Sequence, residues 1–191
     1  AKVCSDNDIP LLIVVPEDNL DALWFSEPFA GCVKLISTPS GTDYFDAIDL
    51  ASKICKSEKF FEEGGAKNVA RRDGMGTTVL SAAATIGKIP DYYFQAIGSG
   101  TGTIAAWEAN LRLIADGRFG TNKMVLIPAQ NYPFTPMYDA WKNGSRDLLP
   151  ADDGKSRELA LQITAKVLSN RRPPYGVAGG LFDALTDSMG D

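Results

Sequence analysis

Histidine is absent from this sequence of 191 residues, and cysteine occurs only three times. The absence of histidine excludes Ser-His-Asp and Cys-His catalysis and every metal site that needs imidazole. Cys4, Cys32 and Cys55 form no CxxC pair, so we expect no structural zinc site and no other bound metal. An odd number of cysteines suits a reducing cytosol better than secretion, and we therefore expect a cytoplasmic protein.

Excess basic charge and long apolar runs are missing as well. The sequence has 19 Lys and Arg residues against 24 Asp and Glu residues, which gives a formal net charge of −5. A general nucleic-acid binder carries a basic face, so no nucleic-acid partner is expected, although a locally positive pocket for a small anion is compatible with this charge. The apolar run Leu11–Val15 is far too short to span a bilayer, and no membrane partner is expected.

Short apolar segments alternate with helical patterns along the chain, which predicts an α/β fold with parallel strands. The first apolar segment lies between two prolines and has the composition of a strand buried on both faces. The segment 59–61 is a further, shorter candidate for a strand. The expected strands are 11–15, 32–36, 93–97 and 124–127.

Amphipathic periodicity predicts a helix over 44–55, with Thr42 as its start, and an Ala-rich helix over 79–86. A third helix is indicated by an apolar stripe of Ile104, Trp107, Leu111 and Ile114. The composition changes between Glu58 and Gly65, so we expect two partial lobes. The first covers residues 1–58 and the second covers residues 59–191.

A glycine-rich segment follows the third expected strand and opens the helix of the apolar stripe. Its residues are Gly98, Ser99, Gly100, Thr101, Gly102 and Thr103. Glycines allow a close approach of the backbone, while the helix N-terminus and the hydroxyl groups attract an anion such as phosphate. It is no Walker loop, because no Gly-Lys-Ser/Thr follows, and the GxGxxG pattern fails at Thr103. On this segment alone, a tight turn that binds nothing is the alternative.

Other segments place this loop in a wider context. Leu12–Glu17, Glu63–Thr77, Tyr93–Ala96 and Ala129–Asn131 occur in an order that resembles the fold type II family of pyridoxal-phosphate enzymes, the tryptophan synthase β-like group. The similarity is greatest to the cysteate synthase and threonine synthase-like branch of methanogenic archaea. The resemblance implies three-layer lobes built on parallel sheets and truncated at both ends, so the chain is expected to be a fragment.

This resemblance also implies the chemistry. The cofactor would be pyridoxal 5'-phosphate, with its phosphate held by residues 98–103. The reaction would replace the phosphate of O-phosphoserine by sulfite, on a route to coenzyme M. Conversion of O-phosphohomoserine and water to threonine is the alternative within the branch, and a non-catalytic module that binds a phosphate ligand is the alternative of another class. Family members suggest a homodimer.

No lysine here matches the family motif that forms the Schiff base with the cofactor, and the resemblance places that motif upstream of Ala1. We therefore assign no catalytic residue in this chain and expect the isolated piece to be inactive.

Five polar side chains are candidates for binding the substrate. Arg71 and Arg72 lie in the Glu63–Thr77 segment, and a guanidinium group suits phosphate or sulfite. Lys67 precedes Arg71 by four residues and shares its face if the segment is helical. Gln130 and Asn131 follow an expected strand, at the end where α/β proteins place ligand contacts. Solvated charges and ordinary loop polar residues are the alternative reading for all five.

Overall fold

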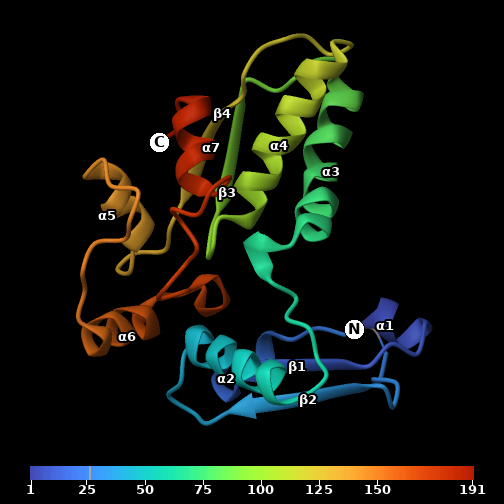
Figure 1. Ribbon diagram of the computed structural model, residues 1–191, viewed down its shortest axis with the longest axis vertical. Helices are drawn as coiled ribbons and strands as arrows, with labels where there is room; N and C mark the ends of the chain where they lie inside the picture. The colour runs from blue at the N-terminus through green and yellow to red at the C-terminus, as the bar shows by residue number, and fades with distance from the viewer. Residues whose placement is uncertain (26) are drawn as a thin grey trace. The chain divides into compact units, whose positions relative to one another are not determined.

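The computed structural model describes residues 1–25 and 27–191 and contains two compact units (Figure 1). Unit 1 comprises residues 1–62 with residues 165–167, and unit 2 comprises residues 63–164 and 168–191. Each unit combines helices with one pair of parallel strands, so the predicted α/β class is confirmed. The assignment of small and large lobes to 1–58 and 59–191 stays a prediction.

Unit 1 is built on the parallel pair β1 and β2, with Ile13 opposite Leu35. Helix α2 packs against β1. The elements are α1 (Lys2–Asp6), β1 (Leu11–Pro16), a 3-10 helix (Glu17–Ala22), β2 (Val33–Thr38) and α2 (Tyr44–Ser57).

Asp43, and not Thr42, caps helix α2. The Asp43 carboxylate accepts a hydrogen bond from the Asp46 N–H at 3.1 Å, and the Asp46 carboxylate accepts one from the Asp43 N–H at 2.9 Å. This reciprocal capping box satisfies two backbone donors at once. The Thr42 hydroxyl donates instead to the Pro39 carbonyl at 2.6 Å, which explains why the predicted start was one residue early.

Two other expectations for unit 1 are wrong. Residues 11–14 of β1 are half-buried, and only Val15 and Pro16 are buried, because β2 is the single strand paired with β1 among the described residues. The segment 59–61 forms no strand, and the Phe61 side chain is 99% exposed.

Unit 2 holds the second parallel pair, in which Phe94 of β3 lies opposite Ile127 of β4. Helix α4 contacts both strands and packs along α3, while α7 contacts α4 and β4 (Figure 1). Short 3-10 turns cover Gly65–Lys67 and Lys166–Leu168. The elements are α3 (Val69–Ile86), β3 (Tyr92–Ala96), α4 (Thr101–Asp116), β4 (Val125–Ala129), α5 (Pro136–Lys142), α6 (Asp153–Gln162) and α7 (Leu181–Ser188).

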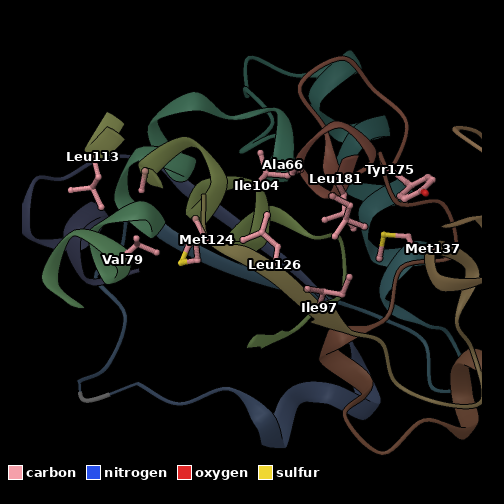
Figure 2. Packing of buried hydrophobic residues seen from close by; sticks show 14 of the residues in the cluster. Ala66, Val79, Ile97, Ile104, Leu113, Met124, Leu126, Met137, Tyr175 and Leu181 are labelled. Atoms are coloured by element: carbon pink, nitrogen blue, oxygen red, sulfur yellow. The ribbon is translucent and has the colours of Figure 1, made fainter. Parts of the chain in front are cut away.

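The core of unit 2 is one cluster of buried side chains. Figure 2 labels several of its members, among them Val79, Leu113, Tyr175 and Leu181. Three residues of the predicted stripe on α4 pack in the core, with Ile104 buried and Trp107 and Ile114 partly buried, but Leu111 is 39% exposed. Small residues (Ala105, Ala106 and Ala109) take its place in the interior. They allow α3 to approach closely, because an added Cβ at Gly76 would lie 3.3 Å from the Ala105 carbonyl oxygen. In the part of the chain that the structure describes, no helix has the length and hydropathy needed to cross a membrane.

Candidate anion-binding site

The glycine-rich loop lies at the carboxyl ends of β3 and β4. The Ile97 N–H donates to the Ala129 carbonyl at 2.9 Å, so the strand pairing continues up to the start of the loop. Residues 98–100 are irregular, and α4 begins at Thr101. The expected order of strand, loop and helix is therefore confirmed. This edge is where parallel α/β sheets place their ligands.

The loop offers a series of backbone donors. The Ile104 N–H is bonded to the Gly100 carbonyl at 3.0 Å, as the first return bond of α4. Within residues 1–25 and 27–191, no hydrogen bond joins the N–H groups of residues 98–103 to a protein acceptor. Residues 100–103 are nevertheless buried. The first N–H groups of any α-helix lack an intrahelical partner, and such a row at the positive end of a helix of 16 residues is suited to an anion.

Two hydroxyl groups lie on the same loop. Ser99 Oγ and Thr101 Oγ1 are 3.0 Å apart, so one donates to the other. The hydroxyl that accepts keeps its own proton for another acceptor. Ser99 is half-buried and Thr101 is 6% exposed. The pair can therefore supply one donated hydrogen bond in addition to the backbone groups.

Thr103 faces the interior instead. Its side chain is fully buried, and its Oγ1 donates to Gln95 Oε1 at 3.2 Å. Because the hydroxyl is used inside the protein, the contribution that Thr103 can make to an anion is its backbone N–H.

The three glycines of the loop are required by their protein neighbours. Gly100 has φ +80°, and a Cβ there would lie 3.0 Å from the Leu181 side chain. A Cβ on Gly98 would lie 3.2 Å from the backbone of Leu168. A Cβ on Gly102 would lie 2.2 Å from the Gln95 amide nitrogen. The glycines alone therefore fit the tight-turn alternative as well, and the free N–H groups are the observation that favours an anion.

Arg71 and Lys67 do not share a helix, so that premise of their pairing is wrong. Asn68 separates them, since its side chain caps α3 by accepting the Arg71 N–H at 3.1 Å. Lys67 ends the preceding 3-10 turn and is exposed. The Arg71 guanidinium is 44% exposed and pairs with Glu63 at 2.6 Å. Both cations remain accessible to a small anion.

Arg72 points into unit 2. Its Nε lies 3.0 Å from Glu108 Oε2, and its Nη1 donates to the Ala66 carbonyl at 2.7 Å. The two charged side chains are 18% and 25% exposed. The guanidinium thus ties α3 to α4 and to the Gly65–Lys67 turn, and its predicted contact with substrate stays a prediction.

Gln130 and Asn131 are also used in local structure. Gln130 Oε1 accepts the N–H groups of Met137 and Tyr138, both at 2.9 Å, and so caps α5. Asn131 Nδ2 donates to the Leu168 carbonyl at 3.4 Å. Since the Leu168 backbone abuts Gly98, Asn131 supports the segment that backs the loop.

Gln95 and Leu168 are loop neighbours that the sequence did not reveal. Gln95 is a polar residue on the face of β3 that also carries half-buried Tyr93, and this break in an apolar pattern is the signal that was available. Leu168 contributes through its backbone, so its residue type gives no signal. Among the described residues, no group of three or more His, Cys, Asp or Glu side chains is arranged to hold a metal ion.

Unit 2 is thus an α/β unit with a glycine-rich loop at the carboxyl edge of parallel strands. No protein-family model matches the chain. The chain is 55% identical to the cysteate synthase of Methanosarcina acetivorans over 191 residues, which is 100% of this chain and 46% of that protein. It is 55% identical to the cysteate synthase of Methanocella arvoryzae over 184 residues, or 95% of this chain and 44% of that protein.

A further relative, the cysteate synthase of Methanospirillum hungatei, is 50% identical over 190 residues, and the match covers 44% of that protein. The chain therefore spans a little under half the length of the curated relatives that it matches.

Proposed function

We propose that this chain is part of a fold type II enzyme that uses pyridoxal 5'-phosphate and forms cysteate from O-phosphoserine and sulfite. The observation that carries the proposal is the row of free N–H groups at residues 98–103, on a chain 55% identical to a cysteate synthase over 191 residues. Unpaired donors at a helix N-terminus fit a phosphate monoester, which is the group by which this cofactor would be held.

The loop has a defined task in this proposal. Its N–H groups and the Ser99–Thr101 hydroxyl pair bind the cofactor phosphate and so fix the position of the ring. When bound, the cofactor supplies an electron sink that makes the Cα–H of the amino acid acidic. The Cβ–O bond to phosphate then breaks, phosphate leaves, and a Cβ–S bond to sulfite forms. We assign the covalent cofactor lysine to no residue of this chain.

Anionic groups of the reactants need cations. Arg71 is the best placed of the predicted substrate residues, because its exposed guanidinium can exchange Glu63 for a phosphate or sulfite oxygen. Lys67 supplies a second exposed charge on the preceding turn. Arg72 ties α3 to α4 and to the Gly65–Lys67 turn, Asn131 supports the Leu168 segment behind the loop, and Gln130 caps α5. A homodimer in the cytoplasm, with no nucleic acid or membrane partner, completes the proposal.

Two measurements on the full-length enzyme test this function. A yellow absorption band that disappears on borohydride treatment would establish a lysine-linked cofactor. Cysteate formed from O-phosphoserine only when sulfite is present would establish the reaction. Threonine formed from O-phosphohomoserine would support the alternative within the branch. A protein that stays colourless with added cofactor would contradict the enzyme proposal and leave the phosphate-binding module.

A further inference from the structure

We propose that Gln95 is a positioning residue for the anion site, because its carboxamide fixes the first turn of α4 in the conformation that presents N–H groups to phosphate. This inference rests on the proposed function, since it concerns the same loop. It assigns a role to a residue outside the glycine-rich segment and outside the predicted substrate set.

Gln95 lies on the side of β3 that faces the helices. Residues 92, 94 and 96 of this strand are exposed, whereas Tyr93 and Gln95 alternate with them and are half-buried. Helix α4 contacts β3. A carboxamide on such a face costs desolvation free energy unless it forms hydrogen bonds, so its presence calls for a specific partner.

The partner is the first turn of α4. Gln95 Oε1 accepts the Thr103 hydroxyl at 3.2 Å. The same carboxamide covers the Cα of Gly102, where an added Cβ would lie 2.2 Å from Nε2 and 2.4 Å from Oε1. Gln95 therefore contacts two consecutive residues of the loop, and a side chain on the first of them would require the carboxamide to move.

These contacts determine what the loop presents. With the Thr103 hydroxyl held inward, the N–H of that residue is kept among the unpaired donors at the start of the helix. The planar carboxamide of Gln95 lies between β3 and Gly102 in the first turn of α4. Both contacts involve neutral groups, and neither occupies an N–H group of the loop. These N–H groups therefore remain available to an anion.

The substitution Gln95→Glu tests whether the carboxamide lies beside the bound phosphate. Glutamate has nearly the same shape and still accepts the Thr103 hydroxyl, but it adds a negative charge beside the loop. Negative charge near a helix N-terminus favours the unliganded protein and opposes a bound phosphate. Charge repulsion by itself reports only that position 95 is close to the phosphate, so the positioning role is tested by a variant that adds no charge. Thr103→Val is the second variant, because it removes the hydroxyl with little change of volume.

The readout is the ratio of the dissociation constants of pyridoxal and pyridoxal 5'-phosphate for the full-length enzyme, measured by absorbance titration. We expect Gln95→Glu to reduce this ratio by about tenfold or more through charge repulsion. Thr103→Val changes the ratio in the same direction. Gln162→Glu is the matched control, since it makes the same charge change at an exposed residue that ends α6.

Three outcomes are possible. A ratio reduced in both Gln95→Glu and Thr103→Val, and unchanged in Gln162→Glu, supports the inference. If the wild-type enzyme prefers the phosphorylated cofactor and Thr103→Val keeps that preference in full, the role of Gln95 is overturned while the cofactor site stands. If the wild-type enzyme shows no preference, the proposed function itself is contradicted. Should Gln95→Glu fail to fold, as judged by circular dichroism, Thr103→Val decides the question.

Discussion

Arg72 of α3 and Glu108 of α4 form an ion pair in which Nε and Oε2 are 3.0 Å apart and the side chains are 18% and 25% exposed. A pair shielded from water to this degree is costly to break from one side, because the remaining charge loses its partner. We expect Arg72→Met to lower the free energy of unfolding by about 1–3 kcal/mol.

The neighbouring Arg71 provides the control. Its pair with Glu63 is largely exposed, so Arg71→Met should change stability by less than about 1 kcal/mol. Urea denaturation of both variants measures the difference. Equal losses would contradict the assignment of Arg72 to the interior and Arg71 to the surface.

Substitution by alanine should have different effects on stability at two glycines of α3. Gly74 has open space around its Cα, so Gly74→Ala should stabilise the helix by about 0.5–1 kcal/mol. At Gly76 a Cβ would lie 3.3 Å from the Ala105 carbonyl oxygen and 3.4 Å from the Ala109 Cβ, so Gly76→Ala must push α4 away. Overpacking of this kind costs about 1 kcal/mol or more and offsets the gain in helix propensity. Thermal denaturation should therefore rank Gly74→Ala above Gly76→Ala, and the reverse ranking would contradict the close packing of α3 on α4.

Tyr175 carries a buried hydroxyl without a partner among the described residues. Its side chain is 1% exposed, and burial raises the pKa of the phenol to about 12. An unpaired buried hydroxyl costs about 1–3 kcal/mol, so Tyr175→Phe should leave stability unchanged or increase it. A clear loss of stability, measured by chemical denaturation, would show that the hydroxyl has a partner.

The stability of the protein should depend on pH through Asp187 of α7. Hydrogen bonds from Lys123 and from the Trp107 indole lower the pKa of this carboxyl group below its usual value. A lowered pKa in the folded state stabilises the protein above the unfolded value, near about 3.9, and the benefit is lost as the pH falls through the folded pKa. Asp187→Asn should therefore lose less stability than the wild type on acidification below about pH 4. Parallel curves for the two proteins would contradict the pairing.

The strands could be predicted because their signal is local. The apolar runs at 11–15 and 93–97 are matched by β1 and β3 to within a residue at each end. In an α/β fold, short apolar runs of this kind are typical of the strands of the sheet. The cap of α2 and the exposure of Leu111 could not be predicted in this way. The first depends on which side chain reaches a backbone N–H, and the second on α3 packing against the small residues of α4.

The candidate site was predictable in position but not in detail. The loop and its place after a strand follow from the glycine pattern and the resemblance. The inward turn of Thr103 depends on Gln95, eight residues away, and the internal role of Arg72 depends on Glu108. Such roles arise from tertiary contacts, which a pattern of residue types does not specify.

The central claim is that residues 98–103 bind the phosphate of pyridoxal 5'-phosphate. Its most direct test is the affinity of the full-length Ser99→Asp variant for pyridoxal 5'-phosphate and for pyridoxal, with Ser81→Asp as a control on the exposed face of α3. We predict that Ser99→Asp loses affinity for the phosphorylated cofactor by about tenfold or more and keeps its affinity for pyridoxal, while Ser81→Asp changes neither. Unchanged binding of pyridoxal 5'-phosphate by Ser99→Asp would contradict it.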